Sequence, residues 1–441
     1  MEIIECILRR YRNKKGFPET NEDLVEVYDA QLKHLGQIAL NGLLEDNLDF
    51  DESELKSHAD ELPAFGVLSV QTGGSKLRPR RHYSFLHKSF QEYFAAIYLC
   101  SQLLNKEISV DELVADRRYL EELKEVLSFT CGMVAARCEE TAEVLIKSIT
   151  VQVNDAKCFS ALLGFISECR REDSSFHLKM ARVCGSFLKL QRLNLEFRLL
   201  SEGDVGLLAE ELKVISTLTE LNLSGNGIGD QGATGLAEAL KVNSTVRVLI
   251  LSRNGICDQG ATGLAEALTV NSTLTELHLD GNEIGDQGAT GLADALKVNS
   301  TLTLLDLAGN GIGAQSATGL AEALKVNSTL TELKLDGNSI GDQGTTGLAE
   351  ALTVNSTLTE LHLDGNKIGD QGATGLADAL KVNSTLTELH LEFNHIGAQG
   401  ATGLAEALKV NSTLTELNLR FNIISDMVRI ELRRLRYDSC L

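Results

Sequence analysis

The feature that most constrains the fold is a 28-residue segment that recurs through the second half of the chain. The copy starting at Leu218 reads LTELNLSGNGIGDQGATGLAEALKVNST, and later copies keep its leucines, central asparagine and small residues at the same spacing. Self-similarity at a fixed period predicts a linear array of equivalent units that bury their apolar faces against their neighbours. The central asparagines are Asn226, Asn254, Asn282, Asn310, Asn338, Asn366, Asn394 and Asn422, after one degenerate copy with Leu190, Leu193, Leu195 and, in the asparagine position, Arg198.

The pattern L-x-x-L-x-L-x-x-N-x-I in each copy resembles the leucine-rich repeat. That resemblance implies an α/β fold, a horseshoe-shaped solenoid with one short parallel strand and one helix per repeat. Leu221 and Leu223 should point inward from the strand, and Asn226 should hydrogen-bond backbone groups in the turn that ends it. Leu236 and Leu240, four residues apart, should face the core from the helix.

Composition divides the chain near residue 190. All three prolines precede it, whereas 32 of 62 acidic residues and 17 of 41 basic ones follow it, so most of the net charge of −21 lies in the repeats. An acidic surface disfavours nucleic-acid binding and suits a basic protein partner. We predict a winged-helix-like domain (1–100), a helical domain (101–188), the repeats (189–425) and a C-terminal cap with a charged outer face (426–441).

Other features exclude whole classes of protein. No stretch approaches 18 consecutive apolar residues, so we expect no membrane span. The opening MEIIECILRRYRNKK has charges within its short apolar run and no secretory cleavage site. The nine cysteines include no C-x-x-C pair, which disfavours a zinc ribbon or a redox dithiol. We expect a cytoplasmic protein with reduced thiols and no cofactor.

The segment from Gly227 to Gly232 matches G-x-G-x-x-G after a strand, as in dinucleotide-binding folds. Other copies replace its glycines with Cys257 and Ser316, and Ser252 stands where a ribose-binding acid would be required. We therefore expect no dinucleotide site.

The tripeptide Asn-Ser-Thr occurs seven times, from Asn243 to Asn411. It is a glycosylation acceptor only in a secreted protein. Because nothing here indicates secretion, we interpret it as a turn between each helix and the next strand.

The copies differ mainly at strand positions that should alternate outward, onto the concave face. Variation confined to one face of otherwise similar repeats is typical of a binding surface. We therefore predict partner binding by Glu276, His278, Asp280, Glu332, Lys334, Asp336, Glu360, His362, Asp364, Glu388, His390, Glu392, Phe393, Arg420 and Phe421.

A ladder of glutamates should run along this face, from Glu332 through Glu360 and Glu388 to Glu416. Like charges on adjacent strands are destabilising, and a cationic partner would relieve their repulsion. The aromatic residues in the last two copies, Phe393 and Phe421, would anchor such a partner. The alternative is that the glutamates are an inherited consensus solvated by water.

The histidines raise the question of a metal, because His362 and His390 should be neighbours flanked by carboxylates. Imidazole and carboxylate suit zinc. A solvent-open strand face offers little support for metal ligands, so the sequence predicts none. We also find no nucleophile–base arrangement, and we expect no enzymatic activity.

The first hundred residues combine helices with a predicted hairpin, whose strands are Phe65–Val70 and His82–Phe85 around the loop QTGGSKLRPRR. Helices with a two-stranded wing indicate a winged helix. The basic loop could suggest nucleic acid, but in a chain this acidic we expect a solvated loop.

The segment YSFLHKSFQEYFAAIYL (Tyr83–Leu99) resembles the winged-helix region of NOD-like receptors, the innate immune sensors that carry repeats of the ribonuclease-inhibitor type. The resemblance implies that His87 contacts nucleotide phosphates. The chain contains no Gly-Lys dipeptide and hence no P-loop, so His87 would need a nucleotide-binding domain supplied from elsewhere. We therefore expect a non-enzymatic recognition protein. The alternatives are a ribonuclease-inhibitor-like binder of a basic protein and a regulator similar to the Ran GTPase-activating proteins.

Overall fold

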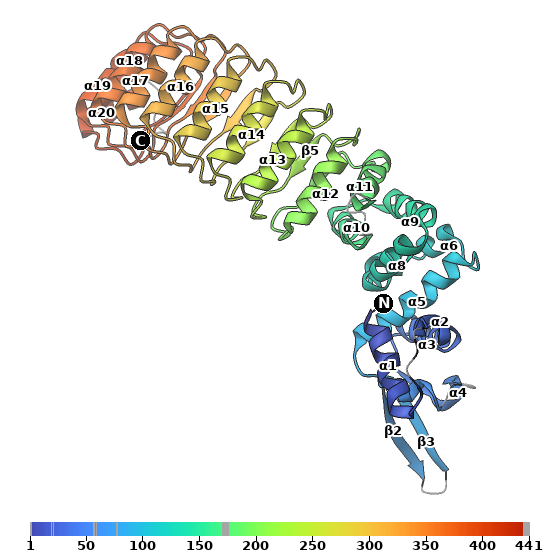
Figure 1. Ribbon diagram of the computed structural model, residues 1–441. Helices are drawn as coiled ribbons and strands as arrows, with labels where there is room; N and C mark the ends of the chain where they lie inside the picture. The colour runs from blue at the N-terminus through green and yellow to red at the C-terminus, as the bar shows by residue number, and fades with distance from the viewer. Residues whose placement is uncertain are drawn as a thin grey trace. The chain divides into compact units, whose positions relative to one another are not determined.

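The computed structural model describes residues 2–18, 20, 22–55, 58, 60–75, 78–169 and 176–434. The chain divides into two compact units, Met1–Phe187 and Leu188–Leu441, drawn in Figure 1. The finer division into four segments stays a prediction.

The first unit begins with helices around a small antiparallel sheet of strand order β1-β3-β2. The most extensive packing between two of its elements joins α3 to α5. There, a Cβ atom added at Gly36 would lie 2.4 Å from the backbone oxygen of Phe94. Only glycine allows the two helices to approach so closely. The elements are α1 (Glu2–Lys15), α2 (Leu24–Val27), α3 (Asp29–Leu44), β1 (Asp49–Asp51), α4 (Glu52–Leu55), a 3₁₀ turn η2 (Leu62–Phe65), β2 (Leu68–Ser75), β3 (Arg78–Phe85) and α5 (Lys88–Leu104).

The predicted hairpin is confirmed, but its loop is shorter than the sequence suggested. Strand pairing continues past Gln71, opposite His82, to Ser75, opposite Arg78. We expected a loop because residues 71–81 lack apolar alternation, yet backbone pairing in a two-stranded ribbon does not require it. Lys76 of the predicted basic loop lies outside the described residues.

Six helices complete the described part of the first unit. Ser109 and Glu112 form a capping box at the start of α6. The described cysteines are all free thiols, and Cys131, Cys169 and Cys184 are buried among the helices. The helices are α6 (Val110–Ala115), α7 (Arg118–Glu121), α8 (Lys124–Arg137), α9 (Glu139–Gln152), α10 (Ala156–Glu168) and α11 (Phe176–Phe187).

The second unit is the predicted repeat solenoid. Its described strands form one nine-stranded parallel sheet in chain order, with a helix after each strand (Figure 1). The degenerate first copy supplies β4, as predicted. The strands are β4 (Arg192–Asn194), β5 (Glu220–Asn222), β6 (Val248–Ile250), β7 (Glu276–His278), β8 (Leu304–Asp306), β9 (Glu332–Lys334), β10 (Glu360–His362), β11 (Glu388–His390) and β12 (Glu416–Asn418). The helices are α12 (Glu202–Leu212), α13 (Gly229–Leu240), α14 (Asp258–Leu268), α15 (Asp286–Leu296), α16 (Ala314–Leu324), α17 (Gly341–Leu352), α18 (Asp370–Leu380), α19 (Ala398–Leu408) and α20 (Asp426–Arg434).

The core of each repeat consists of the predicted leucines and asparagine. Leu221, Leu236 and Leu240 are buried. The side-chain amide of Asn226 donates to the backbone oxygens of Leu195 (2.9 Å) and Leu223 (2.8 Å), and equivalent bonds recur along the solenoid. The asparagine ladder thus satisfies turn carbonyls that would otherwise be buried without partners.

The Asn-Ser-Thr tripeptides form a second asparagine ladder. Asn243 donates to the backbone oxygen of Leu212 at 2.7 Å and accepts from the backbone N–H groups of Thr245 and Val246 at 2.9 Å. The predicted helix-to-strand turn is confirmed, and its asparagine side chain is buried.

Candidate interaction surface on the strand face

The outward side chains of β5–β12, together with the turn residues that follow each strand, make up what we call the strand face. On β10, the buried Leu361 lies between the half-buried Glu360 and His362. The same alternation recurs on most of these strands, as predicted. One departure is Asp306, an outward residue that is itself buried.

The glutamates of the last four strands form the predicted continuous ladder. Glu360 pairs in register with Glu332 on one side and with Glu388 on the other, and Glu388 pairs with Glu416. Leu304 on β8 separates this ladder from Glu276. These glutamates are neighbours because the parallel strands pair residues that are one repeat, 28 positions, apart.

Charge repulsion in the ladder is only partly relieved. Burial, and then the neighbouring Glu332 and Glu388, raise the pKa of Glu360 above its ordinary value. Lys334 forms an ion pair with Glu332, at 2.8 Å between Nζ and Oε1. The ladder is therefore a site where added positive charge would stabilise the protein.

His362 and His390 are stacked beside the ladder, with ring centroids 4.3 Å apart and planes 4° from parallel. Burial, and then the charge of His390 and Lys334, lowers the pKa of His362 to about 4. His362 is therefore a neutral imidazole at neutral pH. The sequence predicted the adjacency of the two rings but not their stacking.

A second acidic row, Asp336, Asp364 and Glu392, follows the strands. Asp336 accepts a hydrogen bond from the backbone N–H of Asp364 at 2.9 Å, and Asp364 accepts one from that of Glu392. Burial, and then the charge of Asp336, raises the pKa of Asp364 to about 6. These acids hold adjacent repeats together, a role that the sequence analysis missed.

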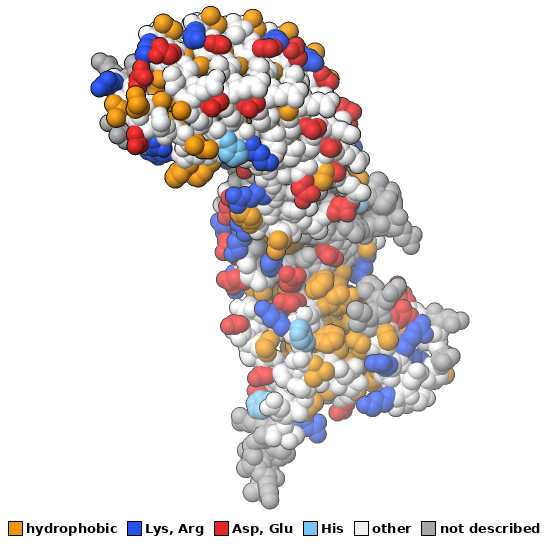
Figure 2. Space-filling model, turned by 90° about the vertical axis from the view of Figure 1, so that its left-hand side faces the viewer, with side chains coloured by type: hydrophobic (Ala, Val, Ile, Leu, Met, Phe, Trp, Pro, Cys, Tyr) orange, Lys and Arg blue, Asp and Glu red, His pale blue; other side chains and the backbone are white. Residues whose placement is uncertain are grey.

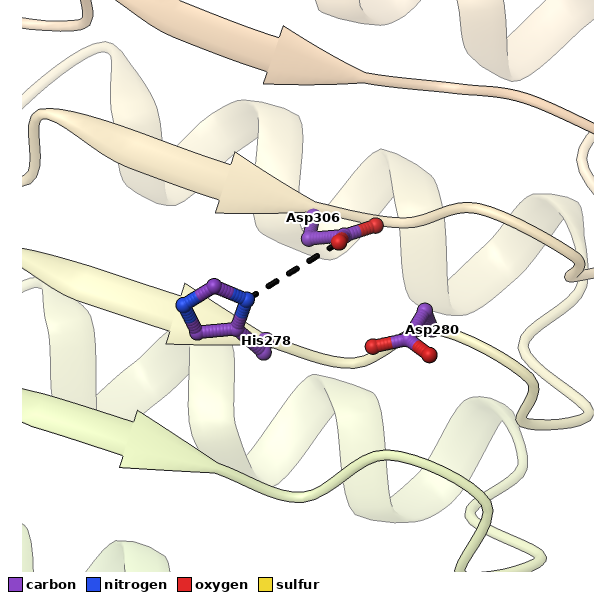
Figure 3. Close-up of side chains that lie close together, drawn as sticks. All are labelled: His278, Asp280 and Asp306. Carbon is purple, nitrogen blue, oxygen red and sulfur yellow. Dashed lines mark ion pairs between the residues drawn. The ribbon is translucent and has the colours of Figure 1, made fainter. Parts of the chain in front are cut away.

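A different cluster lies on β7 and β8, shown in Figure 3. His278 faces Asp306 of the next strand, at 3.8 Å between Nδ1 and Oδ2, and its contact with that carboxylate raises its pKa. Asp280 accepts a hydrogen bond from the Ser252 hydroxyl at 2.5 Å. This cluster therefore contains an ion pair and an aspartate that is hydrogen-bonded to a residue of the preceding repeat.

The predicted aromatic pair lies on the turns after β11 and β12. The rings of Phe393 and Phe421 stack at 4.3 Å and are 58% and 66% exposed. Both residues have a left-handed backbone (φ 51° and 56°), which is unfavourable for a side chain of this size. The preceding residue, Arg420, is exposed.

The sequence analysis missed an apolar extension of this pair. Ile423, Met427 and Ile430 are also exposed, and Figure 2, which faces this end of the repeats, shows hydrophobic side chains gathered there. The predicted charged outer face of the cap is therefore wrong for α20, whose exposed side chains are mixed. The departure of FNIISDMVRI from the repeat consensus was the available signal.

His87 belongs to the first unit, apart from the other predicted site residues. It precedes α5, and its Nδ1 accepts a hydrogen bond from the backbone N–H of Ser89 at 3.1 Å. It lines a groove of about 330 Å³ with Ile4, Phe90, Tyr93 and others. The largely aromatic and aliphatic lining does not by itself supply phosphate ligands.

Comparison with known proteins identifies the repeats. A family model described as Leucine Rich repeat matches residues 214–237, 242–265, 270–293, 298–321, 326–349, 354–377, 382–405 and 410–426. Together with the parallel sheet and its helices, this match confirms the predicted leucine-rich-repeat solenoid. None of the described helices is both long and apolar enough to cross a membrane.

Curated relatives are similar over a limited stretch. The NLR family CARD domain-containing protein 4 of Xenopus tropicalis is 33% identical over 113 residues, which is 23% of this chain and 11% of the relative. The Mus musculus protein of the same name is 33% identical over 116 residues, 24% of this chain and 11% of the relative. The chain thus spans about a tenth of the length of these relatives.

Two solved structures are also similar. A structure of Leiomodin-1 Actin-Binding Site 2 is 24% identical, covers 40% of this chain and 86% of its own, and has a TM-score of 0.29. The tropomodulin C-terminal domain of Caenorhabditis elegans is 19% identical, covers 39% and 98%, and has a TM-score of 0.30.

Proposed function

We propose that this chain is a non-enzymatic, cytoplasmic recognition protein that binds a basic partner protein on the strand face of its repeats, the predicted concave surface. The observation that carries the proposal is the Glu332–Glu416 ladder, whose last two strands are followed by the turns that carry the exposed Phe393–Phe421 pair. Charged residues beside aromatic anchors are the usual composition of a specific protein interface.

We further propose that the protein regulates innate immune signalling, as a relative of NOD-like receptors. Its similarity to the NLR family proteins and the Tyr83–Leu99 motif support this role. The β2–β3 hairpin, in a sheet whose β3 contacts α5 and whose β1 contacts α3, supports a winged-helix domain. In such a receptor, His87 would contact nucleotide phosphates once a nucleotide-binding domain supplied the remaining ligands.

The binding proposal is tested by charge reversal. Glu360→Lys combined with Glu388→Lys should abolish salt-sensitive binding of basic proteins such as pancreatic ribonuclease and lysozyme, measured by surface plasmon resonance. The matched control is Glu266→Lys with Glu350→Lys, which makes the same change in net charge at exposed helix positions. An equal loss of binding in both variants would show that the effect comes from net charge alone, and it would contradict a defined binding site on the strand face.

The choice of basic protein distinguishes a dedicated inhibitor from a receptor. Tight binding of ribonuclease alone, with inhibition of its activity, would favour the ribonuclease-inhibitor-like alternative. Failure of every basic protein to bind the unmodified chain at low salt would contradict an acidic recognition face.

A further inference from the structure

The strand face contains a group of potential metal ligands on β9 and β10. Glu332, Glu360 and His362 each offer one ligand atom, and these atoms all lie within 4.8 Å of one another. The Nε2 atom of His362 is 3.9 Å from Oε2 of Glu360 and 4.0 Å from Oε1 of Glu332. Zinc binds such ligands at about 2.1 Å in a tetrahedral arrangement, which places the ligand atoms about 3.4 Å from one another, close to these separations.

A second observation is independent of the acids. The Nε2 atom of His362 is buried and has no hydrogen-bond partner among the described residues, and the same holds for His390 on the next strand. A buried polar atom without a partner is unfavourable by about 1–3 kcal/mol. A metal ion seated between the glutamates would take up the Nε2 lone pair of His362.

The cluster on β7 and β8 provides a contrast within the same sheet. There, His278 forms an ion pair with Asp306 (Figure 3). Asp306 also accepts a hydrogen bond from the backbone N–H of Ala308 at 3.0 Å, and Asp280 accepts one from the Ser252 hydroxyl. Both aspartates of this cluster therefore already have hydrogen-bond partners. The imidazole nitrogen facing the glutamates of β9 and β10 has no such partner.

We propose that Glu332, Glu360 and His362 form a binding site for a divalent transition-metal ion of the zinc type. The adjacent strand β11 places Glu388 beside Glu360 and His390 beside His362. The sequence weighed against a metal because an open strand face would leave its ligands unsupported. The strand face is not open at this point, since the His362 side chain is only 19% exposed.

Lys334 opposes metal binding. The Nζ atom of Lys334 forms an ion pair with Oε1 of Glu332 at 2.8 Å. A metal ion that binds Glu332 must therefore displace this ammonium group. Asparagine stands at the corresponding positions of β5 and β12, Asn222 and Asn418. Lys334→Asn is therefore a substitution that the solenoid already accommodates, and it should tighten zinc binding.

Titration calorimetry of the full chain with zinc at neutral pH, after chelator treatment, tests the site. We expect saturable binding that His362→Asn weakens by at least about 10-fold and that Lys334→Asn strengthens. His278→Asn, at the equivalent position of β7, is the control and should leave binding unchanged. Circular dichroism checks that each variant is folded.

The absence of saturable heat from the unmodified chain would overturn the proposal, as would undiminished binding by His362→Asn. Loss of binding in His278→Asn alone would place the metal on the other cluster and equally overturn the assignment. Because the probe is the metal ion alone, these results do not depend on the proposed partner protein.

Discussion

Asp258 of one repeat holds Gly285 of the next. Its Oδ1 accepts a hydrogen bond from the backbone N–H of Gly285 at 3.0 Å and a second from that of Gly288 at 2.6 Å. The carboxylate thereby caps the N-terminus of α15 from the neighbouring helix, where backbone N–H groups and the helix dipole favour negative charge.

The presence of this aspartate determines how the next helix begins. Asp230, Asp342 and Asp370 act in the same way. Where the preceding repeat has Ala314 instead, Gly341 turns to a left-handed backbone of φ 60° and α17 starts there. A helix that is capped by the aspartate of the preceding repeat thus begins without the left-handed backbone that only glycine adopts easily.

Ala314→Asp should therefore supply a missing cap. We expect an increase of about 1 kcal/mol in the free energy of unfolding, measured in urea, because caps of this kind contribute about 0.5–2 kcal/mol. Gln315→Asp is the control, since it adds the same charge to the same helix end without reaching the next repeat. Equal stabilisation by both would show that charge alone, rather than the inter-repeat bond, is responsible.

Glu211 offers a second stability test. It is fully buried, and neither carboxylate oxygen has a hydrogen-bond partner among the described residues. Alanine stands at the corresponding position of later repeats, as at Ala239 and Ala267. Glu211→Ala should stabilise the protein at neutral pH by about 1–3 kcal/mol, because it removes an unsatisfied buried group.

The effect of Glu211 should depend on pH in a defined direction. Burial raises the pKa of its carboxyl well above the ordinary value. The folded state therefore binds the proton more tightly than the unfolded state, and the stability this provides is lost as pH rises from below about 4.3 toward the folded pKa. Between pH 4 and 7, the free energy of unfolding of the unmodified protein, measured in urea, should fall progressively below that of Glu211→Ala. A gap that narrows with rising pH would contradict the assignment.

Phe421→Gly should separate binding from stability. Glycine has the same left-handed backbone at this position of other repeats, as at Gly337 and Gly365, so relief of about 1–2 kcal/mol of strain offsets the lost ring stack of about 0.5–1.5 kcal/mol. We expect a change below about 1 kcal/mol in urea unfolding and a roughly 10-fold or greater loss in binding of the basic partner. Phe197→Gly, at the same position of the first repeat, is the control and should bind normally.

Asn327→Ala should be strongly destabilising. Asn327 donates to the backbone oxygens of Leu296 and Asn299 and accepts from two backbone N–H groups. Removing it leaves buried groups unpaired and should lower the unfolding free energy by about 2–3 kcal/mol. Ser328→Ala, in the same tripeptide but exposed, should change stability by less than about 0.5 kcal/mol. Similar changes in the free energy of unfolding for both variants would contradict a structural role for the second asparagine ladder.

Much of the repeat unit was predictable because the 28-residue period of the sequence is also the offset between paired residues on adjacent strands. A residue and its counterpart 28 positions later must be neighbours on adjacent strands. The buried leucines, the first asparagine ladder and the Glu332–Glu416 ladder all follow from that identity. The adjacency of His362 and His390 follows in the same way.

Other features depend on contacts that a repeat pattern does not encode. The sequence did not reveal that hairpin pairing continues to Ser75, because backbone hydrogen bonds leave no side-chain pattern. The apolar end around Met427 was missed because this segment departs from the repeat consensus, so the repeat pattern does not indicate which of its side chains are exposed.

The sequence by itself determined the solenoid, its register and the residues that line its strand face. Only the tertiary structure decided how those side chains are used. His278 and His362 occupy the same position of the repeat, yet contact with Asp306 raises the pKa of His278, whereas burial lowers the pKa of His362 to about 4. The reason is that the repeat length sets which residues are neighbours, whereas burial and hydrogen bonding depend on the particular side chains on either side.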